Sequence, residues 1–125
     1  MLANRNALAT LAVKDLAAAR KFYESKLGLK VVDEAGSEAI TIESGSSKIV
    51  VYRSEFAGTN QATAATWLVG EELDAIVRDL EAKGVAFEKY DFPGMTREGD
   101  IHVSGKIRTA WLKDPDGNIL AINNG

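Results

Sequence analysis

Residues 7–33 read ALATLAVKDLAAARKFYESKLGLKVVD, and this stretch gives the strongest indication of the fold. It opens with an apolar run containing β-branched residues, which is typical of a buried strand. Asp15 is a good N-cap residue, and apolar residues then recur at helical spacing. Gly28 stands where a left-handed glycine commonly ends a helix. The stretch therefore predicts a strand over Ala7 to Val13 and a helix over Leu16 to Lys26.

Three more strands are expected in the first half of the chain. Short apolar runs are separated by turn sequences at Gly36-Ser37 and Gly45-Ser46-Ser47. The predicted strands are Leu29 to Asp33, Ala39 to Glu43 and Lys48 to Tyr52. The order of elements in this half is therefore βαβββ.

The second half repeats the first half. A helical stripe of Leu73, Ile76, Val77 and Leu80 ends at Lys83-Gly84. Strands are expected over Ala64 to Val69, Val85 to Glu88, Ile101 to Val103, Ile107 to Leu112 and Ile119 to Asn123. One constant shift along the chain matches Val13 with Val69, Gly28 with Gly84, Val31 with Phe87 and Thr10 with Thr66.

This internal duplication predicts one α+β domain over residues 1–125, because each half is too small to bury a sheet face alone. Module one is expected over about 7–53 and module two over about 64–125, joined by a link of small and polar residues at 54–63. The composition is globular, with 46% hydrophobic and 26% charged residues. No disulfide can form, since the chain has no cysteine.

Charge and hydropathy argue against several classes of partner. The 15 basic and 18 acidic residues give a net charge of -3 and form no basic run, so nucleic acid is not an expected partner. The first residues lack the apolar core of a signal peptide, and no stretch approaches the roughly 18 apolar residues of a membrane span. The expected location is the cytoplasm.

Two motifs resemble a known group of proteins. Val13-Lys14-Asp15-Leu16, followed by Lys21-Phe22-Tyr23 and Leu27-Gly28-Leu29, resembles the first module of the glyoxalase, bleomycin-resistance and extradiol-dioxygenase group, the vicinal oxygen chelate superfamily. The stretch 110–118, AWLKDPDGN, is similar to that group's penultimate strand and final turn. The resemblance covers essentially the whole chain, and it implies two βαβββ modules that form concave sheets around a small-molecule cavity. Asp114 to Asn118 is interpreted as a turn without a catalytic role.

The resemblance also implies where a metal would bind. Metal-dependent members of the group place His, Gln or Glu on the first strand of each module and Glu on the last strand. The matching positions here are Leu8, Ala64 and Ala121, none of which can donate a lone pair. A slip of one residue to any of Ala7, Ala9, Ala65, Leu120 or Ile122 does not restore the site, because these side chains are equally inert. We therefore expect a metal-free cavity and no cofactor.

The resemblance points Trp111 into this cavity, because the aromatic residue three positions before the Asp-Pro-Asp-Gly turn faces the ligand. Matching Gly45 with Gly105 would place Ile49 and Val51 on the same face as Thr109 and Trp111. Trp67 has the opposite strand parity and should pack under a helix. His102, the single histidine, is expected at the mouth of a strand. A rim or lid of the cavity could be formed by Tyr52, Arg53, Tyr90, Phe92 and Met95. The predicted ligand-binding residues are Trp111, Thr109, Thr10, Thr66, Tyr52 and His102.

Three functions stay open at this point. The first is a glyoxalase- or bleomycin-resistance-like homodimer that binds a small, planar or aromatic organic molecule without a metal. The second is a lyase, isomerase or dioxygenase of the same superfamily that has moved its metal or uses His102, Glu43 or Tyr52 directly. The third is a structural or regulatory protein whose cavity has lost its ligand. The residues do not identify the ligand.

Overall fold

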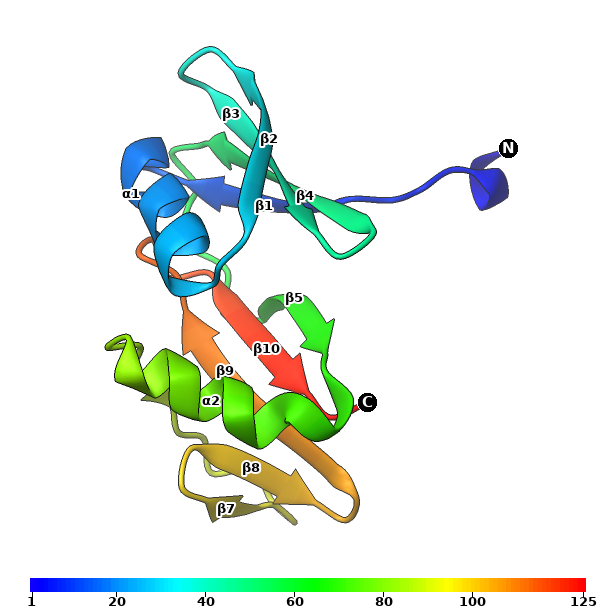
Figure 1. The fold of residues 1–125 in the computed structure, drawn as a ribbon, viewed down its shortest axis with the longest axis vertical. Coiled ribbons are helices and arrows are strands. Elements are labelled where there is room, and N and C mark those ends of the chain that lie inside the picture. Colours follow the sequence, from blue (N-terminus) through cyan, green and yellow to red (C-terminus); the bar gives the residue numbers. More distant parts are fainter.

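The first half of the chain forms a four-stranded sheet in the order β1-β4-β3-β2 (Figure 1). This computed structural model describes all 125 residues. Strand β1 runs parallel to β4, and the other neighbours are antiparallel. The bounds are β1 Ala9–Val13, β2 Lys30–Ala35, β3 Ala39–Ser44 and β4 Ser47–Arg53. A short 3-10 helix, η1 (Leu2–Asn4), lies on an N-terminal arm that extends away from this sheet (Figure 1).

One continuous helical segment joins β1 to β2. It consists of α1 (Leu16–Lys21) and a π-helical end, η2 (Phe22–Lys26). The Asp15 side chain caps it by accepting the Ala18 amide at 3.0 Å. Gly28 adopts φ 70°, and the amide of Leu29 then bonds the Tyr23 carbonyl at 3.0 Å. The predicted helix, its cap and its glycine stop are confirmed.

The second half forms a six-stranded sheet in the order β5-β10-β9-β8-β7, and β6 pairs with the end of β9. Helix α2 (Leu73–Ala82), preceded by the 3-10 helix η3 (Gly70–Glu72), lies across this sheet (Figure 1). The bounds are β5 Thr63–Leu68, β6 Phe87–Glu88, β7 Thr96–Glu98, β8 Ile101–Ser104, β9 Ile107–Lys113 and β10 Ile119–Asn123. Strand β7 was not predicted, because its three residues are polar and exposed and show no alternation.

The two sheets have related topologies, which supports the duplication. Strand β10 takes the place in its sheet that β4 takes in the first sheet. The β3–β4 turn at Gly45 therefore corresponds to the β9–β10 turn at Gly117, and the match with Gly105 was wrong. Ile49 and Val51 consequently belong to the helix-facing core, where they are 5% and 0% exposed. Glycine turns join several of these hairpins, so glycine alone could not show which pair was equivalent.

A shared apolar core lies between the sheets and their helices. Leu11 and Val13 of β1 face α1, while Leu112 of β9 and Leu120 of β10 face α2, and all four are buried in one cluster. The opposite face of each sheet carries no helix of the chain (Figure 1). No helix is both long enough and apolar enough to cross a membrane.

The turn after β9 joins the two modules. The Asn118 side-chain amide donates to the Ala12 carbonyl at the end of β1 at 2.8 Å. The amide of Lys14 donates to a carboxylate oxygen of Asp116 at 3.0 Å. The Asp-Pro-Asp-Gly-Asn segment is therefore both the expected turn and a polar contact between the halves.

Candidate functional site

Trp111 lies on the face of β9 that is turned away from α2. Its neighbours Ala110 and Leu112 are buried in the core, so strand alternation directs Trp111 to the open face. It pairs with Ala121 of β10, as expected, and shares its face with Thr109. The indole Nε1 donates to Thr63 Oγ1 at 3.2 Å. Asn123 Nδ2 donates to Thr109 Oγ1 at 2.8 Å.

Three other aromatic rings surround Trp111. His102 packs edge-on at 4.9 Å between ring centroids, Tyr90 at 5.4 Å and Phe92 at 5.8 Å. Tyr90 and Phe92 belong to the segment between β6 and β7, which therefore covers the indole as a lid. Burial raises the pKa of the Tyr90 phenol, and the charge of Glu88 adds to this shift. The phenol stays protonated at neutral pH and can donate a hydrogen bond.

His102 lies at the start of β8, and its side chain is buried at 1% exposure. Its Nε2 accepts the Tyr90 amide at 2.9 Å. This bond requires a lone pair on Nε2 and assigns the proton of the neutral ring to Nδ1. Nδ1 is itself buried and has no hydrogen-bond partner. The single imidazole therefore helps to anchor the lid and keeps one unused donor.

Thr66 joins this face from β5, where it pairs with Ala121. A bulge between Ile119 and Leu120 leaves Ala64 without a partner residue on β10. Beside this bulge, Thr63 accepts the hydrogen bond from the Trp111 indole, a contact that was not predicted from the sequence. The bulge left no signal in the apolar pattern, so only the presence of a hydroxyl next to Ala64 could have suggested Thr63.

Thr10 and Tyr52 lie on the other sheet. Tyr52 pairs with Ala12 and Thr10 with Val50, so both side chains occupy the open face of the first sheet. Tyr52 is 40% exposed. The structure thus brings Trp111, Thr109, Thr66 and His102 together on one face and places the other two predicted residues on another.

The residues considered as catalytic groups are also separated. Glu43 lies at the end of β3 between Lys30 and Lys48 on the neighbouring strands, and its side chain is exposed. Tyr52 belongs to β4, and His102 belongs to the second sheet. These three side chains therefore form no common acid–base group within one chain.

The donor set does not fit the divalent ion of the metal-dependent proteins. Leu8, Ala64 and Ala121 offer no ligand atoms. Nowhere in the chain do three side chains from His, Asp or Glu come together as a possible metal site. The Nε2 atom of His102, the one imidazole nitrogen with a lone pair, is already bonded to the backbone.

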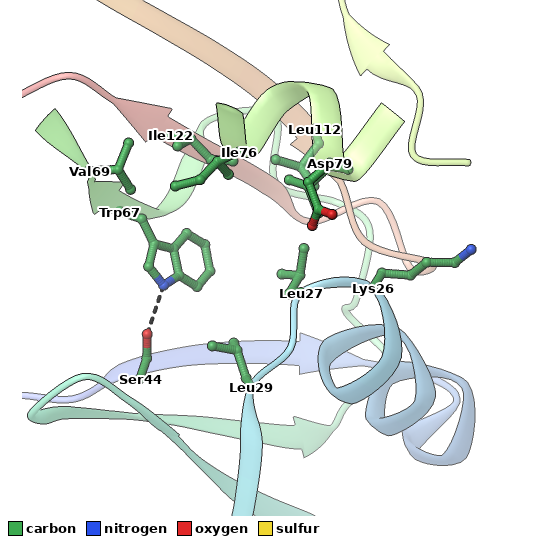
Figure 2. Close-up of a pocket in the computed structure, with 11 residues that line it drawn as sticks. Lys26, Leu27, Leu29, Ser44, Trp67, Val69, Ile76, Asp79, Leu112 and Ile122 are labelled. Atoms are coloured by element: carbon green, nitrogen blue, oxygen red, sulfur yellow. Dashed lines mark hydrogen bonds between the residues drawn. The ribbon is translucent and has the colours of Figure 1, made fainter. Parts of the chain in front are cut away.

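A second hollow lies on the opposite side of the second sheet. This cavity has a volume of about 250 Å³ and is lined by residues of both halves, including Trp67 (Figure 2). Trp67 packs near Ile76 and Leu80 of α2, as its strand parity predicted. No sequence pattern predicts this cavity, because it forms where two modules meet and depends on their relative placement.

Comparison with known proteins identifies one family model, described as the Glyoxalase/Bleomycin resistance protein/Dioxygenase superfamily, which matches residues 6–122. No curated protein matches the chain in sequence.

Solved structures share the fold. A lactoylglutathione lyase from Agrobacterium tumefaciens is 16% identical with a TM-score of 0.70, over 95% of this chain and 92% of that one. A mutant fosfomycin resistance protein FosX from Listeria monocytogenes, complexed with Mn(II) and a dihydroxypropylphosphonic acid, is 18% identical with a TM-score of 0.72, over 98% and 90%. A protein from the mobile metagenome of V. Pseudocholerae is 26% identical with a TM-score of 0.61, over 91% and 88%.

Proposed function

The chain belongs to the glyoxalase/bleomycin resistance protein/dioxygenase superfamily, and from this premise we propose that it binds a small, planar organic molecule on Trp111 without a metal. The observation that carries the proposal is the arrangement around the indole. The flat apolar face of the Trp111 ring lies beside the hydroxyls of Thr63 and Thr109, and the His102 ring packs against it. Apolar surface with a few directed polar groups is the usual make-up of a small-molecule site.

The lid determines how such a ligand enters. Tyr90 and Phe92 occupy the space against Trp111, and Phe92 is 46% exposed. Outward movement of this segment would free the indole face, and an aromatic ligand would replace the lost ring contacts with similar ones. Opening also breaks the bond from the Tyr90 amide to His102, which leaves both imidazole nitrogens free to bond the ligand.

A second copy of the chain is proposed to close the site. Leu8 on β1's N-terminal side and Leu68 at the end of β5 are 43% and 70% exposed, and Tyr52 lies on the same open face as Thr10. Apolar side chains on uncovered sheet faces favour association. The open face of one copy's first sheet would bring Thr10 and Tyr52 toward the partner's Trp111 in a symmetric homodimer.

The test is native mass spectrometry of the purified protein, followed by titration with 1-naphthol as a planar probe. We expect a species of twice 13.4 kDa that contains no metal and takes up one naphthol per chain. A monomer that binds no probe would contradict the proposal. A stoichiometric metal would show that the reading of positions 8, 64 and 121 is wrong.

A further inference from the structure

The cavity beneath α2 is separate from the Trp111 face. Leu112 and Ile122 line it, whereas their neighbours Trp111 and Ala121 point to the other side of the sheet. Eight of its eleven lining residues are hydrophobic. Figure 2 shows Leu27 and Leu29 of the first module facing Trp67 and Ile76 of the second across the open space.

Two hydrogen bonds connect the walls of this cavity. Trp67 Nε1 donates to Ser44 Oγ at 2.8 Å, which joins β5 to the end of β3. The ammonium of Lys26 donates to the Lys83 carbonyl and so joins η2 to the end of α2. Both bonds cross from one module to the other, so they fix the relative position of the two walls.

The mouth of the cavity carries one acceptor. Figure 2 shows the Asp79 carboxylate directed from α2 toward Leu27, while the Lys26 ammonium points away from the cavity. Asp79 pairs with Lys83 at 3.2 Å, and its side chain is 62% exposed. A small molecule can therefore reach the cavity from solvent, with its polar end at Asp79 and its apolar part against Trp67.

We propose that this cavity is a second ligand site, which takes a compact apolar molecule bearing one hydrogen-bond donor, such as a small cyclic or short-chain alcohol or amine. An engineered apolar cavity of about 150 Å³ in another protein binds benzene. Here the volume is about 250 Å³, which also accommodates a donor group. The Asp79 carboxylate selects donors and cations over anions.

The test compares benzyl alcohol with benzoate, which share a ring and differ in the head group. The chain has two tryptophans, so in Trp111→Phe the indole N–H signal in an NMR titration belongs to Trp67 alone. Benzyl alcohol should shift this signal and the Ile76 methyl signals saturably, and benzoate should bind at least about tenfold more weakly. Asp79→Asn should reduce this preference.

Substitutions that fill the cavity with a larger side chain distinguish binding of benzyl alcohol in the cavity from a general effect of the alcohol on the solvent. Ile76→Phe should weaken benzyl alcohol at least about tenfold, whereas Ile107→Ala, at a 57% exposed position away from the cavity, should not change its affinity. Val69→Leu adds one methylene and should weaken it less, which provides a test if the larger change prevents folding. Shifts that grow linearly without saturation, or equal affinity in a folded Ile76→Phe protein, would overturn the proposal. Neither result tests the proposed site at Trp111, because that site lies on the opposite face of the sheet and is probed with 1-naphthol.

Discussion

Tyr23 donates its phenolic hydrogen to the Asp114 carboxylate at 2.8 Å, and this contact joins residues 91 positions apart. Tyr23 is 0% exposed at the end of the first helix, and Asp114 is 4% exposed at the start of the β9–β10 turn. The same carboxylate accepts the amides of Asp116 and Asn118 at 3.0 and 2.9 Å. Tyr23 and Asp114 belong to the two motifs that carry the resemblance to the superfamily. This hydrogen bond therefore joins the two motifs and, with them, the two modules.

Tyr23→Phe should lower the free energy of unfolding by about 1–3 kcal/mol, because it leaves a buried carboxylate with one donor fewer. The measurement is urea denaturation at pH 7. Tyr52→Phe is the matched control, because it removes the same hydroxyl from a ring that is 40% exposed. This substitution should change the free energy of unfolding by less than about 0.5 kcal/mol. Equal effects of the two substitutions would show that the buried bond contributes nothing.

The same contact predicts a loss of stability at high pH. Burial, together with the charge of Asp114, raises the pKa of Tyr23 above its ordinary value of 10.0. The folded protein therefore holds this proton more tightly than the unfolded chain does. The stabilisation that the bound Tyr23 proton gives to the folded state is complete below about pH 10. It decreases as the pH rises further, because Tyr23 ionises in the unfolded chain. Tyr23→Phe should flatten the fall in melting temperature between pH 9.5 and 11 relative to the unmodified protein, and identical profiles would contradict this account.

Gly58 permits the link between modules to pass close to the turn. It adopts φ 80°, and an added Cβ would lie 2.7 Å from the carbonyl oxygen of Asp116. Gly58→Ala should therefore cost about 1–3 kcal/mol beyond the penalty of the left-handed backbone. Gly36→Ala isolates that penalty, because Gly36 has φ 57° and nothing within 4 Å of its added Cβ. Thermal unfolding of both proteins gives the difference, and equal melting temperatures would argue against the close approach.

Local chemistry made much of this fold predictable. The apolar run of β1, the Asp15 cap and the Gly28 stop act within a few residues of each other, so the sequence pattern carries them directly. Strand parity likewise assigned Trp67 to the helix side, whereas the direction of Trp111 was predicted from the family resemblance. These features depend on the periodicity of one element at a time.

Features that depend on two elements could not be predicted in this way. The bulge that accompanies Thr63 arises from pairing with β10, and the polar strand β7 is held by its partner β8. The burial of His102 follows from the lid that folds over it. The cavity beside Trp67 exists only because two modules pack at a particular separation. None of these relationships leaves a periodic pattern in the chain.

Addition of Mn²⁺, Ni²⁺ or Zn²⁺ should leave the melting temperature unchanged, because the three expected ligand positions are Leu8, Ala64 and Ala121. A specific ion at 100 times its dissociation constant would stabilise the folded state by about 2.7 kcal/mol, which is an easily measured shift. A saturable rise with any of these ions would mean that the assignment of the three ligand positions is wrong.

The final prediction tests the proposed site at Trp111, which faces Ala121 and bonds Thr63 through its indole nitrogen. Stacking of 1-naphthol on the indole should contribute on the order of 1 kcal/mol beyond contact area, so Trp111→Ala should weaken binding at least about tenfold. Trp67→Phe is the control for a general loss of packing. Quenching of tryptophan emission by naphthol should persist in Trp67→Phe and disappear in Trp111→Phe. If quenching instead survives in Trp111→Phe and is lost in Trp67→Phe, the planar ligand occupies the cavity beneath α2 and the open face of the second sheet is not its site.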